Sequence, residues 1–256
     1  MPDTRTILIT GGTGAIGSQL VKHFLDREFT VVTTSRRKLS PVEYAEATGI
    51  EAPSGQLHLI QIDLEDEDSP RRLTVALEKQ GLRPTALVNN ARNLEYLKLD
   101  AQGRPERKAW LGEFTLDVVS AYELTLALAY QSGTVLKRVV NISSMYGVVA
   151  PTPELYTDFE KQSPVQYGVA KAALIHLTKE LAVRLADRSV AVNCVSYGGV
   201  EGRVDDAFKQ RYARLCPSGR MLKVDEVAGA VDFLTSEAAS MITGQNLVVD
   251  GGWSTW

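Results

Sequence analysis

The chain has 256 residues, of which 44% are hydrophobic and 23% are charged, and its formal net charge is -3. This composition is that of an ordinary globular protein and argues against a disordered or fibrous chain. The basic residues are scattered apart from Arg36, Arg37 and Lys38, so we expect no nucleic-acid partner. No apolar run approaches the roughly 18 residues that a membrane-spanning helix requires, so no membrane partner is expected.

The first residues lead directly into the run TRTILITGG, without the basic and apolar segments of a secretion signal. The two cysteines are Cys194 and Cys216, and thiols in a chain without an export signal usually stay reduced. No cluster of histidines and cysteines has metal-ligand spacing. We therefore expect a cytoplasmic protein without disulfides or a metal site.

Short runs rich in β-branched and apolar residues alternate with longer segments of helical periodicity. The nearly continuous hydrophobicity of the short runs is typical of strands buried on both faces of a parallel sheet. The predicted strands are 6–10, 30–35, 57–62, 85–90, 138–143, 190–196 and 246–250. The predicted helices are about 14–27, 70–80, 109–131, 164–187 and 224–236.

Two serine–proline pairs mark helix starts, because serine caps the first turn and proline fits into it. Ser69 precedes Pro70 at the start of the predicted helix 70–80, and Ser40 before Pro41 indicates a further, shorter helix. Alternating strands and helices predict an α/β, Rossmann-type doubly wound sheet of about seven parallel strands with right-handed crossovers. No repeat, low-complexity tract or linker interrupts the pattern, so the whole chain, 1–256, is expected to form a single domain.

The segment ITGGTGAIG joins the first predicted strand to the first predicted helix. Gly11, Gly14 and Gly17 have no Cβ, so the backbone can turn tightly and lie against a pyrophosphate. The N-terminus of the helix adds free N–H donors and a partial positive charge. A simple strand-to-helix turn would leave the same pattern, but its place after the first strand favours a dinucleotide site. We assign Thr13 and Ile16 of this turn to the same site.

The end of the second predicted strand bears on which dinucleotide binds. A carboxylate there usually meets the 2′-hydroxyl of NAD, whereas the 2′-phosphate of NADP requires cations. Here Ser35 stands at the place of the acid and is followed by Arg36 and Arg37. Arginine binds phosphate in a bidentate geometry, so Arg36 is predicted to be the main contact. NADP(H) is favoured, while NAD(H) and a merely solvated basic loop are the alternatives.

Several motifs, taken together and in order, resemble those of the short-chain dehydrogenase/reductase family in its compact, single-domain branch. They are TGGTGAIG, IDL at 62–64, NNA at 89–91, NISS at 141–144, YGVAK at 167–171, VNCVS at 192–196 and TGQNLVVDGG at 243–252. The likeness covers nearly the whole chain. It implies a nicotinamide cofactor and the transfer of a hydride between a secondary alcohol and a ketone.

The resemblance also assigns individual cofactor contacts. It implies that Asp63 and Leu64 border the adenine, and that Asn89 and Ala91 lie beside the cofactor. The turn that follows the sixth predicted strand adds two further predicted cofactor contacts, which are Gly198 and Val200. Ser144, Tyr167 and Lys171 form the implied catalytic set.

The residues themselves support this catalytic set. Tyr167 and Lys171 are four positions apart on a predicted helix and therefore share one face. A phenol in water loses its proton only near pH 10, but an ammonium group about 4 Å away stabilises the phenolate by roughly 4 kcal/mol. Lys171 can thus make Tyr167 a usable acid and base, while Ser144 hydrogen-bonds the substrate oxygen. A surface Tyr–Lys pair is the alternative, which the preceding motifs disfavour.

Three positions depart from the family pattern. Val119 stands where the resemblance implies an asparagine that connects the catalytic lysine to solvent, so the proton relay is predicted to be lost or rerouted. Tyr197 replaces a proline that usually precedes the glycine after the sixth strand, and we expect its side chain to reach the substrate. Arg92 replaces a glycine after NNA, which fits either an anionic substrate or an ordinary surface arginine.

Ser144 and Tyr167 are separated by 22 residues, a longer interval than in most compact members. Extra residues at this edge of a doubly wound sheet form a loop that helps to build the site. We expect Tyr146 and Tyr156 in this loop to line or cover the substrate pocket. The run MYGVVAP is most similar to bacterial oxidoreductases of surface-sugar and flagellin-glycan pathways, which implies a sugar or sugar-phosphate substrate. A loop that only shields a small carbonyl compound from water is the alternative.

The leading hypothesis is an NADP(H)-dependent oxidoreductase that interconverts a secondary alcohol and a ketone, with Tyr167 as general acid and base. A non-catalytic NADP-binding regulator or scaffold is one alternative, and a sugar epimerase or dehydratase that recycles tightly held NAD is another. Apolar positions of the predicted helices 109–131 and 164–187 resemble the surfaces through which family members form homotetramers or dimers. We therefore expect a homo-oligomer.

Overall fold

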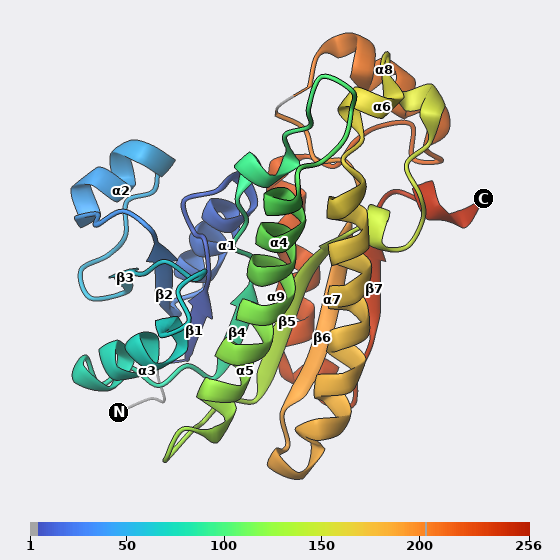
Figure 1. The fold of residues 1–256 in the computed structure, drawn as a ribbon. Helices are drawn as coiled ribbons and strands as arrows, with labels where there is room; N and C mark the ends of the chain where they lie inside the picture. The colour runs from blue at the N-terminus through green and yellow to red at the C-terminus, as the bar shows by residue number, and fades with distance from the viewer. Residues whose placement is uncertain (1–4, 203) are drawn as a thin grey trace.

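The computed structural model describes residues 5–202 and 204–256. Its framework is a sheet of seven parallel strands in the order β3-β2-β1-β4-β5-β6-β7 (Figure 1). The strands are β1 Thr6–Ile9, β2 Thr30–Ser35, β3 Leu57–Gln61, β4 Ala86–Asn89, β5 Arg138–Ser144, β6 Ala191–Tyr197 and β7 Asn246–Val249. Each predicted strand is present to within one residue at either end, so the predicted Rossmann-type α/β fold is confirmed.

Helices cover both faces of the sheet. The α-helices of the described residues are α1 Ala15–Asp26, α2 Pro41–Thr48, α3 Ser69–Lys79, α4 Arg107–Phe114, α5 Ser120–Tyr130, α6 Phe159–Gln162, α7 Val165–Arg184, α8 Asp206–Leu215 and α9 Ala228–Thr235. Helices α3, α5 and α7 pack on one face, while α1 and α9 pack on the other. The sequence did not predict α6 or α8, which lie together beyond one end of α7 (Figure 1).

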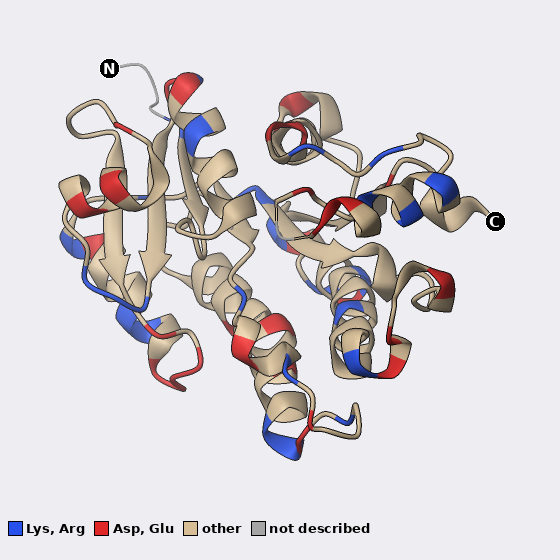
Figure 2. Cartoon of the chain, turned by 90° about the horizontal axis from the view of Figure 1, so that it is seen from above, with Lys and Arg blue, Asp and Glu red and all other residues tan. Residues whose placement is uncertain are grey.

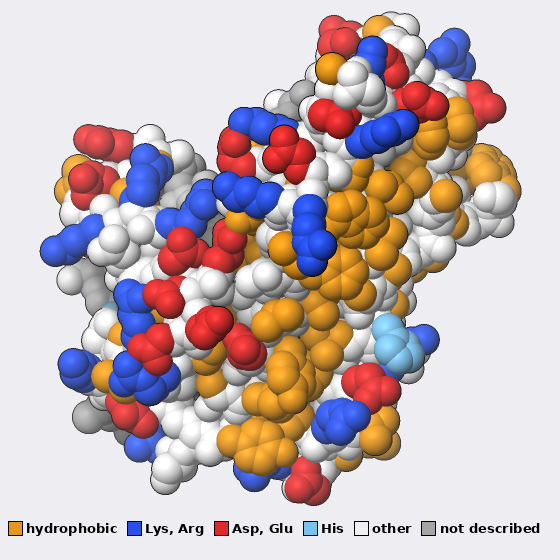
Figure 3. Space-filling view, viewed as in Figure 1, with side chains coloured by type: hydrophobic (Ala, Val, Ile, Leu, Met, Phe, Trp, Pro, Cys, Tyr) orange, Lys and Arg blue, Asp and Glu red, His pale blue; other side chains and the backbone are white. Residues whose placement is uncertain are grey.

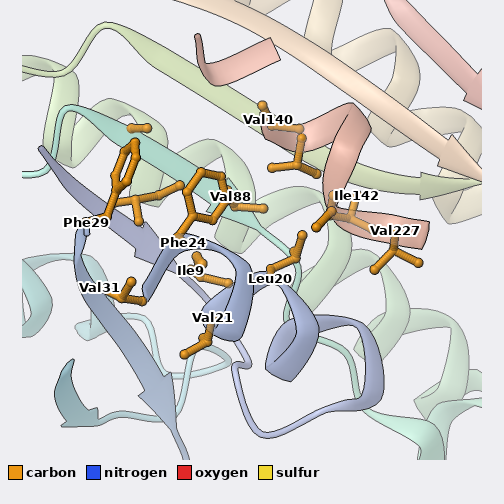
Figure 4. Close-up of a cluster of buried hydrophobic side chains, with 14 of the residues drawn as sticks. Ile9, Leu20, Val21, Phe24, Phe29, Val31, Val88, Val140, Ile142 and Val227 are labelled. Carbon is orange, nitrogen blue, oxygen red and sulfur yellow. The ribbon is translucent and has the colours of Figure 1, made fainter. Parts of the chain in front are cut away.

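An apolar core lies beneath α1 and α9. Ile9 and Val88 project from the strands and pack against Leu20 and Phe24 of α1, and Val227 closes the cluster at the start of α9 (Figure 4). All five side chains are fully buried. Removing a side chain of this size from water contributes about 1.5–3 kcal/mol to folding. This packing fixes α1 against the strand that precedes it, and so fixes the turn between them.

A second core fills the opposite face of the sheet. Leu8 and Leu87 project to this side because successive side chains of a strand point to opposite faces. They pack with Leu77 of α3, Leu124 of α5 and Leu181 of α7, all of them buried. Strands with a core on both sides have little place for polar residues, which explains their continuous apolar runs.

The two serine–proline helix starts have different outcomes. Ser40 caps α2 as predicted: its Oγ accepts a hydrogen bond from the Glu43 N–H, and the Glu43 carboxylate accepts one from the Ser40 N–H. Helix α3 begins one residue earlier than expected, so Asp68 holds the capping position. The Ser69 hydroxyl instead donates to the Leu64 carbonyl.

The predicted helix 109–131 is interrupted. Between α4 and α5 the chain forms a π-helical turn, Thr115–Val119, and such a turn inserts an extra residue that changes the direction of the side chains. Asp117 in this turn is buried, whereas the side chain of Val119 is 45% exposed. The polar residue that this turn presents to the interior is therefore Asp117.

Other expectations concern the chain as a whole. Cys194 and Cys216 are both buried and unpaired, as expected. Within the described residues every helix is too short or too polar to cross a bilayer. The same residues hold no group of three His, Cys, Asp or Glu side chains arranged for a metal ion. Basic and acidic residues are interspersed over the described part of the chain (Figure 2).

Candidate active site

A cleft with a volume of about 990 Å³ opens at the carboxyl edge of the sheet. Parallel strands all end at this edge, which is where doubly wound folds bind their ligands. The cleft brings together predicted residues that are far apart in the sequence. It is lined by Gly11, Thr13, Gly14, Ile16, Gly17, Ser35, Arg36, Arg37, Asp63, Leu64, Ala91, Arg92, Ser144, Tyr167, Lys171, Tyr197, Gly198 and Val200, among others.

The glycine turn forms one wall of this cleft. Gly11 has a φ of +69°, and a Cβ at this position would lie 2.8 Å from the Ala91 Cα. A Cβ at Gly17 would lie 2.2 Å from the Gly11 carbonyl oxygen, so neither position can hold a larger residue without a shift of backbone. The Gly14 N–H donates to the Gly11 carbonyl at 3.1 Å, and α1 begins at the next residue. A backbone without side chains at a helix N-terminus fits the pyrophosphate of a dinucleotide.

The two arginines after β2 stand at the rim of the same cleft. The Ser35 hydroxyl accepts a hydrogen bond from the Arg37 N–H at 3.2 Å, and the Gln61 side chain donates to the Arg36 carbonyl at 3.3 Å. These contacts hold the backbone of the turn. Both side chains are exposed, and neither guanidinium forms an ion pair with another described residue. Two positive charges are therefore available beside the cleft.

Asn89 does not have the place that was predicted for it. Its side chain is buried behind the strand, where its amide donates to the Asn141 Oδ1 at 2.8 Å and lies 3.4 Å from the Thr125 hydroxyl. It ties β4 to β5 and α5 instead of lining the cleft. The next two residues, Asn90 and Ala91, line the cleft.

The catalytic set that the sequence predicted converges on the cleft from two elements. Ser144 ends β5, and its Oγ accepts a hydrogen bond from the Tyr146 N–H at 3.2 Å. Tyr167 and Lys171 stand one turn apart on α7. The Ser143 hydroxyl donates to the Lys171 carbonyl at 3.0 Å, and the Lys171 ammonium donates to the Ile142 carbonyl at the same distance. These two contacts fasten α7 to the end of β5.

The Lys171 ammonium also has a buried counter-ion that the sequence reasoning missed. Its Nζ lies 3.0 Å from the Asp117 Oδ2, and both side chains are almost completely buried. Val119, the position predicted to disturb the surroundings of the lysine, faces outward instead. The π-helical turn instead directs Asp117 at Lys171, so a lost or rerouted proton relay stays a prediction. A single aspartate inside the apolar run LDVV was the available signal, because a charge on an apolar helix face requires a partner.

A second carboxyl group lies beside this ion pair. Glu113 is on α4, one turn before Asp117, and is 2% exposed. Neither of its carboxylate oxygens has a hydrogen-bond partner among the described residues. Burial, and then the negative charge of Asp117, raise the pKa of Glu113 to about 7. A small cavity of about 10 Å³, at the lower limit of the space that can hold one water molecule, adjoins Asp117 and Lys171.

Arg92 lies over the predicted catalytic tyrosine. Its guanidinium carbon is 4.2 Å from the centre of the Tyr167 ring, and the Lys171 Nζ is 5.8 Å from the same centre. A cation in contact with an aromatic face is stabilised by about 0.5–1 kcal/mol at an exposed site. Arg92 is itself exposed, so it stands at the mouth of the cleft with its charge available.

The loop between Ser144 and α7 packs against α8 and the C-terminal segment. Tyr146 and Tyr156 join hydroxyl to hydroxyl at 2.6 Å and pack with Tyr212 and Trp253. Burial raises the pKa of both Tyr146 and Tyr156, so both hydroxyls stay protonated. Neither ring is among the residues that line the cleft, which argues against a direct contact with substrate.

Tyr197 does not turn its hydroxyl toward the cleft. The hydroxyl donates to the Val227 carbonyl, and the residue is 3% exposed within the core beneath α9. The hydroxyl of Tyr197 is therefore not available to a substrate, although the residue lines the cleft. The next residue, Gly198, follows in the wall of the cleft, where a Cβ would lie 2.8 Å from the Asp250 Cα.

Comparison with known proteins adds independent findings. Residues 12–254 match the family model described as enoyl-(acyl carrier protein) reductase. A short-chain type dehydrogenase/reductase of Sinorhizobium fredii, y4vI, is 32% identical over 264 residues; the match covers 97% of this chain but 43% of that protein. Post-translational flagellin modification protein A of Campylobacter coli is 26% identical over 271 residues, with 99% of both chains covered.

Among solved structures, a short-chain dehydrogenase from Leptospira borgpetersenii with bound NAD+ superposes with a TM-score of 0.84. It is 28% identical in sequence, and the match covers 98% of this chain and 92% of that one. The family model and the structural match both cover nearly the whole chain. The chain belongs to the short-chain dehydrogenase/reductase family and is an enzyme that depends on a nicotinamide cofactor.

Proposed function

We propose that the protein is an NADP(H)-dependent oxidoreductase that interconverts a secondary alcohol and a ketone, with Tyr167 as its general acid and base. The observation that carries this proposal is that Ser144, Tyr167 and Lys171 line the same cleft as the glycine turn. A ligand in this cleft is within reach of both the proposed catalytic groups and the proposed cofactor site.

The proposed chemistry divides between cofactor and protein. The nicotinamide, when bound, supplies or takes up the hydride. In reduction, the Tyr167 hydroxyl gives its proton to the carbonyl oxygen of the substrate; in oxidation, the phenolate takes the proton from the alcohol. The Ser144 oxygen already accepts a hydrogen bond from backbone, so its own proton is free to bind the substrate oxygen, where charge develops.

Lys171 contributes charge to this site. Its ammonium donates a hydrogen bond to the Ile142 carbonyl and pairs with Asp117, so the ammonium group is fixed in place. A fixed positive charge near the phenolate lowers the free energy of the charged form. Arg92, over the face of the Tyr167 ring, adds a second positive charge on the solvent side.

The two arginines after β2 support NADP(H) over NAD(H). A guanidinium at this place binds a 2′-phosphate, whereas an NAD site usually has a carboxylate there. Fluorescence titration of the protein with NADPH and with NADH tests the choice. We expect micromolar binding of NADPH and much weaker binding of NADH. Equal affinities would remove the proposed preference.

We further propose that the substrate is a sugar or a sugar phosphate. The relative from Campylobacter coli is named for flagellin modification, and Arg92 at the mouth of the cleft suits a phosphate or carboxylate group. Turnover of a panel of sugar-derived ketones and simple ketones with NADPH tests this. Tyr167→Phe is expected to abolish turnover and to retain NADPH binding, with Tyr156→Phe as the matched control. Full activity of Tyr167→Phe would overturn the proposed role.

A homo-oligomer, dimer or tetramer, is part of the same proposal. Exposed apolar side chains gather along the outer faces of α4, α5 and α7 (Figure 3). They are Leu111, Val119, Tyr122, Tyr130, Val165 and Val169. A continuous apolar patch of this kind marks an interaction surface. We also propose that residues 1–256 act as one cytoplasmic domain. Light scattering after size-exclusion chromatography tests the oligomer, and a monomer would contradict it.

A further inference from the structure

Glu113 is a buried acid for which the proposed reaction has no use. Its helix, α4, packs against α7, and neither of its carboxylate oxygens has a hydrogen-bond partner among the described residues. Its nearest acidic neighbour is Asp117, whose Oδ2 faces Lys171. Burying a carboxylate without a donor costs several kcal/mol, so an ionised Glu113 in this place requires compensation.

The surroundings of Glu113 supply little compensation. The π-helical turn contributes Asp117, α7 contributes Lys171, and the segment after β4 contributes Arg92. Lys171 is already paired with Asp117, and Arg92 is exposed and stacked on Tyr167. The helical turn Leu94–Leu97, which also packs on α4, carries Tyr96 and Glu95. The Tyr96 hydroxyl is committed to Glu65, and Glu95 is paired with Lys98 at the surface.

A proton on Glu113 removes its negative charge, and with it the need for a compensating partner. Two carboxyl groups in contact can form a hydrogen bond only if one of them is protonated, because an ionised carboxylate is an acceptor without a donor. Protonated Glu113 becomes the donor, and the ionised Asp117 becomes its acceptor. One carboxylate then remains to balance one ammonium group.

We propose that Glu113 carries a proton in the working enzyme and donates it in a hydrogen bond to Asp117, which holds the Asp117 carboxylate against Lys171. Glu113 is then a positioning residue that acts through Asp117 and Lys171. Its effect on catalysis rests on the proposed function, in which Lys171 stabilises the Tyr167 phenolate. The protonation of Glu113 itself does not depend on that function.

The net charge of Glu113, Asp117 and Lys171 together is expected to change within the working pH range. The raised pKa of Glu113, about 7, places its ionisation there. Loss of the proton puts a second negative charge near Lys171 and removes the hydrogen bond to Asp117. The extra charge disfavours the phenolate of Tyr167, so alcohol oxidation, which begins from the phenolate, is expected to slow above about pH 7.

Difference infrared spectroscopy tests the protonation directly, without cofactor or substrate. The wild type is compared with Glu113→Gln between about pH 5 and pH 9. We expect the wild type to show the carbonyl stretch of a protonated carboxylic acid that disappears as the pH rises through about 7, and Glu113→Gln to lack this band. Glu106→Gln, at the exposed start of α4, is the matched control and should retain it. A wild type without the band at any of these pH values would overturn the proposal.

The pH profile of kcat for alcohol oxidation provides the functional readout. We expect an ionisation near pH 7 in the wild type and its absence in Glu113→Gln, which should be severalfold faster than the wild type at about pH 9. Identical profiles would overturn the positioning role. If Glu113→Gln does not fold, wild type labelled with ¹³C at its glutamate carboxyls gives the infrared result alone. NADPH titration separates the two proposals: loss of binding counts against the proposed function and leaves the infrared test intact.

Discussion

The Lys171 Nζ and the Asp117 Oδ2 are 3.0 Å apart, and both side chains are removed from solvent. Asp117 comes from a π-helical turn, and Lys171 comes from the second turn of α7. The pair therefore joins the π-helical turn to α7, one helical turn after the proposed catalytic tyrosine. A buried charge of this kind is tolerated only with its partner, so each of the two residues makes the other necessary.

Asp117→Ala is expected to destabilise the protein by about 3–5 kcal/mol, because it leaves the Lys171 ammonium buried without a counter-ion. Denaturant unfolding of the wild type and the variant measures the difference. Val119→Ala, in the same turn but exposed, is the control and should change stability by less than about 0.5 kcal/mol. Similar stabilities for Asp117→Ala and wild type would mean that the ion pair has no structural role.

Arg36→Asp is expected to weaken NADPH binding by about tenfold to a hundredfold, because it removes a charged hydrogen bond and adds a repulsive carboxylate. NADH binding should strengthen or stay the same. The ratio of the two dissociation constants is the measurement. Lys38→Asp changes the same charge two residues away, at a position that does not line the cleft, and should affect the ratio much less. An unchanged ratio in Arg36→Asp would refute the assigned contact.

Gly17→Ala is expected to impair both folding and cofactor binding, since its Cβ would lie 2.2 Å from the Gly11 carbonyl oxygen and 2.7 Å from the Asn90 side chain. Crowding of this kind typically costs about 1–3 kcal/mol. Melting temperature and NADPH titration together measure the effect. Gly229→Ala, in α9, is the control: nothing lies within 4 Å of its added Cβ, so it should stabilise the helix by up to about 1 kcal/mol. Wild-type affinity in Gly17→Ala would show that the turn is not in contact with the cofactor.

The stability of the folded chain should fall as pH rises through the neutral range. The pKa of Glu113 is raised from 4.5 to about 7 in the folded state, so the folded state binds the proton more tightly than the unfolded state. The resulting stabilisation is fully present below about pH 4.5 and is lost as the pH rises through about 7. Its upper limit is about 3 kcal/mol. Urea unfolding at a series of pH values should show this decrease in the wild type and a smaller one in Glu113→Gln; parallel curves would contradict it.

Much of the fold and part of the site follow from local sequence. Strands with a core on each face are continuously apolar, and this pattern predicted all seven strands. The glycine turn and the Tyr167–Lys171 pair are each defined by spacing within one short segment, so the sequence alone predicts them. Helix α8 escaped prediction because it packs against the loop after β5 and not on the sheet, and Tyr212 is its one fully buried residue.

The side-chain orientations that the sequence did not reveal depend on contacts between distant segments. The π-helical turn directs Asp117 inward and leaves Val119 exposed, and the lone aspartate in an apolar run was the one local signal of this arrangement. The Tyr197 hydroxyl is held in the core because the Val227 carbonyl, thirty residues later, accepts its hydrogen bond. The Asn89 side chain does not line the cleft because it hydrogen-bonds to Asn141 in the neighbouring strand. Such orientations are decided by tertiary packing, which sequence periodicity does not encode.

The attachment of α7 to the end of β5 has a consequence for how this enzyme can diversify. Lys171 is bound through its main chain to Ser143 and through its side chain to Ile142, so two hydrogen bonds outside the intervening loop connect it to the end of β5. The loop beyond Gly147, where an added Cβ would lie 2.8 Å from the Lys171 carbonyl carbon, can therefore change its length or sequence while the proposed catalytic groups keep their geometry. The proposed catalytic residues and most of the loop that joins them are separable parts of one short stretch, and insertions can accumulate in the loop without moving Ser144 or Lys171.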